Sequence, residues 1–148
     1  FAFIVLILDI LKGYLTTYYI FNYVIINSSN YELIQYILSS VAILGHLFPI
    51  WLKFKGGKGV ATYIGFIFAI NPFIGIIFIF LWLFVAFLKN YSSLASISSL
   101  IAIPFIMMFF SYQPRILLLF FLISFILICR HYNNIKRLLH NNESKIKF

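Results

Sequence analysis

The feature that most constrains this chain is its succession of apolar runs, separated by short polar breaks. Of its 148 residues, 64% are hydrophobic and only 9% are charged, whereas a soluble domain is about 25% charged. A domain of this size also leaves a large share of its surface in water. The composition therefore excludes an ordinary soluble domain and a disordered tail, and the single Cys129 excludes a disulfide scaffold. It indicates an all-α, polytopic integral membrane protein.

The polar breaks divide the chain into six apolar segments. We expect these segments to be transmembrane helices of a single membrane domain, residues 1–148. They are residues 1–26, 33–52, 60–70, 73–88, 94–110 and 116–129. A basic loop at residues 53–59 and a polar tail at residues 130–148 complete the chain. Ile135, Leu138 and Leu139 share one helical stripe, which predicts that the tail is helical through Leu139.

The break at Asn71-Pro72 decides how the later loops are oriented. Proline lacks a backbone donor and disfavours helical backbone in the residue before it, so residues 60–88 are predicted to form a hairpin. Cytoplasmic loops of membrane proteins carry an excess of Lys and Arg. The hairpin leaves Arg115 alone on one side, opposite nine cations: Lys53, Lys55, Lys58, Lys89, Arg130, Lys136, Arg137, Lys145 and Lys147. A single crossing would divide them four against six, so the hairpin is favoured.

The formal charge of +8 also bears on the partner. Eleven Lys and Arg residues stand against the three acids Asp9, Glu32 and Glu143. In a chain this apolar, the excess indicates loops that face anionic membrane lipid, and nucleic acid is not an expected partner.

The basic loop carries the strongest sign of a binding site. Lys55, Gly56, Gly57 and Lys58 combine open backbone N–H groups, flexible ammonium groups and the start of a helix, which together suit an anion such as phosphate. The loop is not a P-loop, because Leu52 stands where the first glycine of that motif belongs. The alternative is a flexible loop that only sets topology.

Three polar residues lie within or at the end of apolar segments. Asp9 and Lys12 are three residues apart on one helical face and can form an ion pair. Charges inside a span are costly and usually face a protein interior or a wet cavity. The pair is therefore either structural or part of a polar site. His46 likewise is either a hydrogen-bonded packing residue or a catalytic one.

Two further clusters are expected on the same membrane face as the basic loop. Ser93 and Ser96 open a span with small residues that either favour close helix packing or reach a shared ligand. His131 and Asn134 are three residues apart and suit hydrogen bonds to a polar substrate. The clusters contain no paired carboxylates and no metal-ligand group, so we expect no metal and no cofactor. The residues alone leave open an enzyme acting on a phosphate-bearing substrate, a small transporter or a lipid-binding membrane protein.

Several stretches resemble the bacterial acyl-phosphate:glycerol-3-phosphate acyltransferases. Residues 45–62, GHLFPIWLKFKGGKGVAT, are similar to the second motif of that family, and residues 93–96 to its third. Residues 8–13, LDILKG, resemble the start of its second helix, and residues 130–139 resemble its tail. Tyr132, Asn133 and Asn142 depart from the family pattern. The resemblance covers essentially the whole chain in the expected order.

The resemblance implies an integral enzyme of the bacterial inner membrane with its active site facing the cytoplasm. Members have seven helices, so the six segments here correspond to the last six, and the family's first motif is expected upstream of Phe1. They transfer an acyl group from acyl phosphate to the 1-position of glycerol 3-phosphate, which supplies phospholipid biosynthesis. By resemblance, Gly56, Gly57 and Lys58, with Ser96 beside them, would hold the donor's phosphate. His131 and Asn134 would hold glycerol 3-phosphate.

Overall fold

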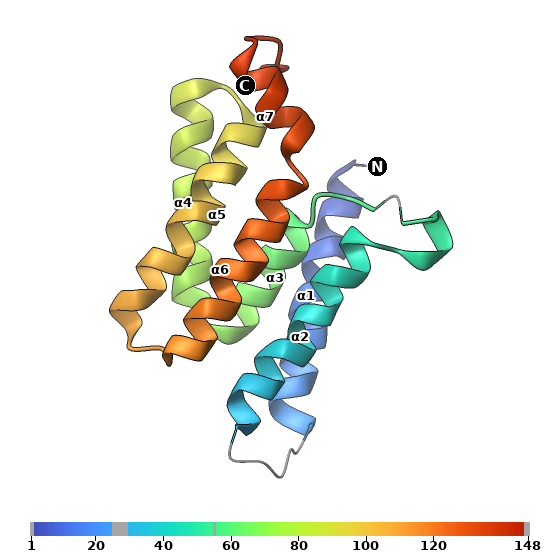
Figure 1. The fold of residues 1–148 in the computed structure, drawn as a ribbon, viewed down its shortest axis with the longest axis vertical. Helices are drawn as coiled ribbons and strands as arrows, with labels where there is room; N and C mark the ends of the chain where they lie inside the picture. Colours follow the sequence, from blue (N-terminus) through green and yellow to red (C-terminus); the bar gives the residue numbers. More distant parts are fainter. Residues whose placement is uncertain (1, 25–29, 55, 147–148) are drawn as a thin grey trace. The chain divides into compact units, whose positions relative to one another are not determined.

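The computed structural model describes residues 2–24, 30–54 and 56–146, and within those residues the chain is helical with no strand (Figure 1). Its helices are α1 (Ala2–Tyr23), α2 (Tyr31–Leu47), η1 (Ile50–Leu52), α3 (Val60–Ile70), α4 (Pro72–Lys89), α5 (Ser92–Met107), η2 (Met108–Phe110), α6 (Pro114–Cys129) and α7 (Tyr132–Leu139). The all-helical prediction is confirmed for these residues.

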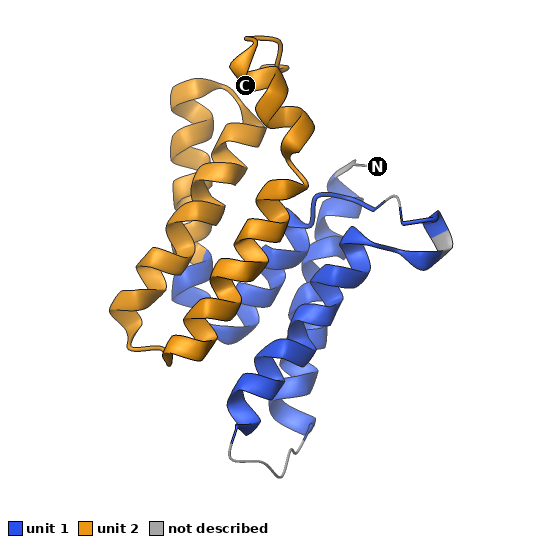
Figure 2. Cartoon of the chain, in the orientation of Figure 1, with its two compact units in different colours: residues 1–75 blue, residues 76–148 orange. Residues whose placement is uncertain are grey.

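The chain divides into two compact units, Phe1–Gly75 and Ile76–Phe148 (Figure 2). Unit 1 contains α1, α2, η1, α3 and the first turn of α4. Unit 2 contains the rest of α4 together with α5, η2, α6 and α7. The basic loop therefore belongs to unit 1, and the tail belongs to unit 2.

Three helices in the described residues are long and apolar enough to cross a membrane: Phe3–Tyr23, Pro72–Lys89 and Ser92–Phe110. α6 and α7, which meet at a bend of 62°, make a fourth candidate when the pair is taken as one span. α3 is apolar but has only 11 residues, so it reaches about half way through a ~30 Å hydrocarbon core. These helices are those of an integral membrane protein.

Unit 1 is held together by a close crossing of α1 and α3. A side chain at Gly13 would collide with the backbone of Thr62 and Phe66, and one at Gly65 would collide with the backbone of Ile10 and Tyr14. The two glycines therefore allow the two backbones to touch. Between apolar helices such close van der Waals packing is a main source of association.

α2 packs on the other end of α1 and stops earlier than its apolar run. The side-chain amide of Gln35 donates to the carbonyls of Ile20 and Val24, at 3.4 and 3.3 Å. The segment predicted at residues 33–52 is not one helix, because α2 ends at Leu47 just before Pro49. Proline has no N–H to continue the helical pattern, and the chain turns through η1 into the basic loop.

The predicted break at Asn71-Pro72 is present. Asn71 has extended backbone, with φ −149° and ψ 102°, and ends α3. Its side-chain oxygen accepts from the N–H groups of Phe73 and Ile74, at 3.1 and 3.4 Å, and so caps α4. A side chain at Gly75 would collide with the Phe68 ring, so the start of α4 faces the end of α3.

Contacts in unit 2 join its helices side by side and hold the tail at one end. Phe105 of α5 meets Phe121 of α6 edge to face, with ring centroids 5.1 Å apart. Near the end of the chain, the N–H of Ile146 donates to the Asn90 carbonyl at 2.7 Å. These contacts place the tail and the α4–α5 connection at the same end of unit 2.

The α1–α3 crossing generates a test by substitution. Gly65→Ala forces the two backbones apart, and overpacking of this kind typically costs about 1–3 kcal/mol. We expect a lower thermal midpoint for the purified protein in detergent. Gly45→Ala is the matched control, because a side chain there meets nothing within 4 Å and alanine is favoured over glycine inside a helix by roughly 0.5–1 kcal/mol. Equal midpoints for the two variants would contradict the close crossing.

Candidate functional site

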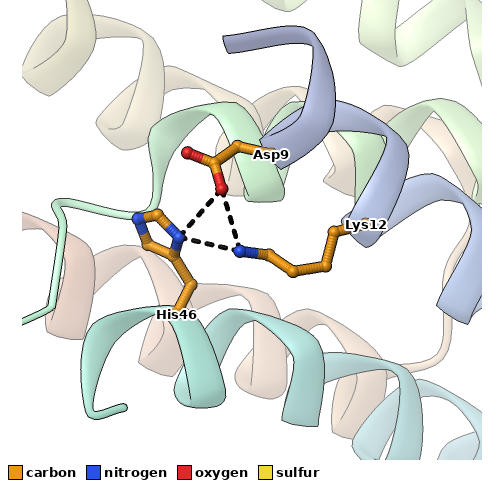
Figure 3. Close-up of polar contacts among 3 residues, drawn as sticks. All are labelled: Asp9, Lys12 and His46. Carbon is orange, nitrogen blue, oxygen red and sulfur yellow. Dashed lines mark hydrogen bonds and ion pairs between the residues drawn. The ribbon is translucent and has the colours of Figure 1, made fainter. Parts of the chain in front are cut away.

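A polar cluster joins α1 to the end of α2 in unit 1 (Figure 3). Lys12 Nζ donates to Asp9 Oδ1 at 2.9 Å. It also lies 2.9 Å from Nδ1 of His46, and that nitrogen is 3.2 Å from Asp9 Oδ1. The side chains of Asp9 and His46 are 21% and 18% exposed. The ion pair expected from the sequence is thus present and extends to a histidine 34 residues beyond Lys12.

The glycine-rich loop folds back onto this histidine. The N–H of Gly57 donates to the His46 carbonyl at 3.3 Å. Added side chains at Gly56 and Gly57 would collide, respectively, with the backbone carbonyls of His46 and Leu47 and with the His46 ring. Glycine is therefore required here by close approach, and the Gly57 N–H is directed at the protein. Lys55 lies outside the described residues.

The loop leads directly into the N-terminus of α3. Gly59 has φ 79°, in the left-handed region that suits glycine, and its carbonyl accepts from the N–H of Tyr63 at 2.9 Å. The first N–H groups of a helix have no intrahelical partner and carry partial positive charge. The exposed Lys58 lies two residues before Val60, where α3 begins, so this end of α3 favours an anion.

A cavity of about 430 Å³ opens beside the cluster and the loop. It is lined by Lys12, Thr16, Val41, Ala42, Gly45, His46, Pro49, Leu52, Gly56 and Gly57. Lys12 and His46 therefore share the wall of one cavity in unit 1 with the loop glycines Gly56 and Gly57.

The two predicted serines lie buried at the start of α5 in unit 2. Ser96 Oγ accepts from the indole N–H of Trp82 at 3.0 Å and donates to the Ser92 carbonyl at 3.0 Å. The hydroxyl of Ser93 is buried without a hydrogen bond of good geometry. Ser96 thus ties α4 to α5, whereas the Ser93 hydroxyl lies near the Glu143 carboxylate.

His131 and Asn134 are buried where α6 bends into α7, with exposures of 1% and 4%. Nδ1 of His131 lies 2.8 Å from the Leu127 carbonyl. A carbonyl only accepts, so the proton is assigned to Nδ1, and Nε2 of the neutral ring carries the lone pair. The structure therefore fixes both the orientation and the tautomer of His131.

Glu143 contacts a predicted site residue, Asn134, and the sequence interpretation did not select it. Its carboxylate accepts from the Asn134 amide and from the Arg137 guanidinium, both at 2.6 Å. Burial alone would raise the pKa of Glu143, but the nearby Ser93 hydroxyl, Asn134 and Arg137 outweigh it and lower the pKa to about 2. The sequence does offer one signal for it, because Glu143 is the one acidic residue in the basic tail.

The predicted site residues thus form two groups. Asp9, Lys12, His46, Gly56 and Gly57 are connected within unit 1. In unit 2, Glu143 links Ser93 to Asn134, with Ser96 one turn beyond Ser93.

The depressed pKa of Glu143 predicts how the tail responds to acid. Its stabilising contribution is complete above the ordinary value near 4.5 and is lost as the pH falls through about 2. Hydrogen exchange of residues 134–146, corrected for intrinsic rates, is expected to lose protection in that window. Glu143→Gln should lose it already at neutral pH, whereas Glu32→Gln should not. Unchanged protection in Glu143→Gln would contradict the contact.

Comparisons with known proteins agree along nearly the whole chain. A family model described as "Glycerol-3-phosphate acyltransferase" matches residues 1–141. A protein of that name from Pelagibacter ubique (strain HTCC1062) is 43% identical over 143 residues, which are 96% of this chain and 70% of the relative. Another, from Wolbachia pipientis subsp. Culex pipiens (strain wPip), is 40% identical over 97% of this chain and 72% of the relative.

Two solved structures are also similar to this chain at 33% sequence identity. They are crystal structures of PlsY (YgiH), an integral membrane glycerol 3-phosphate acyltransferase, in a lysophosphatidic acid form and a glycerol 3-phosphate form. Their TM-scores are 0.87 and 0.88, over 97% of this chain and 71% and 70% of those chains. Sequence and structure together show that the chain belongs to the glycerol-3-phosphate acyltransferase family.

Proposed function

We propose that this protein transfers a fatty acyl group from acyl phosphate to the 1-position of glycerol 3-phosphate, giving lysophosphatidic acid and phosphate for phospholipid biosynthesis. The observation that carries the proposal is the likeness, over 97% of the chain, to an acyltransferase solved in a glycerol 3-phosphate form. The anion-favouring end of α3 supplies the chemistry for a phosphate-bearing substrate.

The protein works as one membrane domain in the bacterial inner membrane. Its six transmembrane helices correspond to the last six of the family's seven, and the basic loop, the α4–α5 connection and the tail all face the cytoplasm. The excess of Lys and Arg in these three segments supports this orientation. The contact of Ile146 with Asn90 supports it for the latter two.

The donor's phosphate binds at the basic loop. Lys58 supplies an ammonium group, the first turn of α3 supplies backbone N–H groups, and Lys55, Gly56, Gly57 and Ser96 line the site. An acyl phosphate is an activated mixed anhydride. Catalysis therefore needs positioning and stabilisation of the developing charge rather than a covalent nucleophile.

Glycerol 3-phosphate binds at the start of the tail, with Ser93 nearby. Because the Asn134 amide nitrogen donates to Glu143, its side-chain oxygen is left to accept from a substrate hydroxyl. His131, whose Nδ1 lies 2.8 Å from the Leu127 carbonyl, is the second residue of this site. Both side chains are buried, which keeps them in the orientation that the acceptor substrate needs.

The reaction follows once both substrates are bound on the cytoplasmic face of the membrane. The 1-hydroxyl oxygen attacks the acyl carbonyl carbon, a carbon–oxygen bond forms, and the bond from that carbon to the phosphate oxygen breaks. The hydroxyl proton leaves on the released phosphate. Lys58 and the α3 N-terminus stabilise the charge on the leaving phosphate.

Product analysis tests the proposal directly. The purified protein in lipid nanodiscs is given acyl phosphate and labelled glycerol 3-phosphate. We expect lysophosphatidic acid and inorganic phosphate in equal amounts. Movement of glycerol 3-phosphate across a vesicle membrane without acylation would instead support a transporter and overturn the proposal.

Lys58→Ala tests the donor site. Removing one preorganised donor of this kind typically lowers the rate by about 10²–10³. The measurement is turnover of acyl phosphate at saturating glycerol 3-phosphate. Lys53→Asn is the matched control, because it removes a neighbouring charge and asparagine tolerates the left-handed backbone of Lys53, at φ 52°. Near-normal turnover by Lys58→Ala would contradict a role in donor binding and would mean that the basic loop only sets the membrane topology.

Asn134→Ala and His131→Ala test the acceptor site. A hydrogen bond to a charged partner is worth about 1.5–3 kcal/mol, which is roughly ten- to a hundred-fold in affinity for glycerol 3-phosphate. Steady-state kinetics with each substrate varied in turn should show a raised KM for glycerol 3-phosphate and a nearly unchanged KM for acyl phosphate. Equal damage to both substrates would remove the two residues from the acceptor site.

A further inference from the structure

The glycine-rich loop is supported by one residue outside it. His46 holds Gly57 through its backbone carbonyl, and its ring edge at Nε2 lies against the position of the Gly57 side-chain hydrogen. The Gly56 backbone rests on the His46 and Leu47 carbonyls. The position of the loop therefore depends on where the His46 ring and its peptide group lie.

The opposite edge of that ring is fixed from α1. Lys12 Nζ lies 2.9 Å from Nδ1, closer than the 3.2 Å between Nδ1 and Asp9 Oδ1 (Figure 3). The ammonium group of Lys12 and the carboxylate of Asp9 therefore both contact the Nδ1 edge of the ring. Asp9 in turn accepts from Lys12 at 2.9 Å. Asp9 and Lys12 thus set the orientation of the ring, as outer partners do for metal-binding histidines.

We propose that His46 is a positioning residue for the acyl-phosphate donor. The Asp9–Lys12 pair fixes the orientation of its ring, and the ring presents its Nε2 edge to the glycine-rich loop. The loop then holds Lys58 and the first N–H groups of α3 in place for the donor's phosphate. This inference rests on the proposed function, because it assigns His46 to one of the two substrates of that reaction.

The test separates the two ring nitrogens by conservative substitution. Gln places an amide near the Nε2 position, whereas Asn places one near Nδ1 and leaves the loop without support. In nanodiscs, we expect His46→Asn to raise the KM for acyl phosphate ten-fold or more, with less than a three-fold change in the KM for glycerol 3-phosphate. His46→Gln should stay within three-fold of the parent protein for both. His140→Asn, an exposed histidine in the tail, is the control.

A second comparison tests whether Asp9 and Lys12 act through the ring. The charge-neutral double variant Asp9→Asn, Lys12→Met should raise the KM for acyl phosphate in the parent protein but add no further increase in the His46→Gln background. The proposal would be overturned if the double variant raised the KM for acyl phosphate equally in both backgrounds. It would also be overturned if His46→Asn raised the KM for both substrates equally, which would leave His46 as a packing residue. If the parent protein makes no lysophosphatidic acid from acyl phosphate, the proposed function itself is wrong. Failure of the His46 proposal alone would instead leave the parent protein active.

Discussion

The contact on which the rest of unit 1 depends is the close crossing of α1 and α3 at Gly13 and Gly65. Gly13 follows Lys12 directly, so the crossing fixes the position of the lysine along α3. Gly65 lies five residues after Val60, where α3 begins and the basic loop ends. Two glycines thus determine how far the Asp9–Lys12 pair lies from the loop. Larger side chains could not do this, because small residues are needed for the two backbones to approach this closely.

The polar groups near the membrane show a second common principle. Charge in an apolar surrounding is costly unless it is paired. Asp9 is satisfied by Lys12 and His46, and Glu143 by Asn134 and Arg137. Each of the two acids therefore has at least one partner that is a candidate site residue: Lys12 and His46 for Asp9, and Asn134 for Glu143. The interactions that offset the cost of a buried charge therefore also orient the side chains that would meet substrate.

The sequence predicted those parts of the fold that depend on local chemistry. Apolar runs gave the helices, Asn71-Pro72 gave the break between α3 and α4, and the i, i+3 spacing gave the Asp9–Lys12 pair. It missed features that arise from distant contacts. His46 meets Lys12 across 34 residues, and the direction of the Gly57 N–H follows from the turn after Pro49. Glu143 was noted only as a charge, because its pairing depends on how the tail folds back.

The central proposal is that the basic loop of unit 1 and the tail of unit 2 both face the cytoplasm. Thiol cross-linking tests it most directly, in native membranes and in a Cys129→Ser background. We expect a short bifunctional reagent to join Lys58→Cys to Asn133→Cys, since both positions are exposed. It should not join Lys58→Cys to Ser111→Cys, which the hairpin topology places on the other side. Cross-linking of the second pair and not the first, with every cysteine separately reactive, would contradict the account.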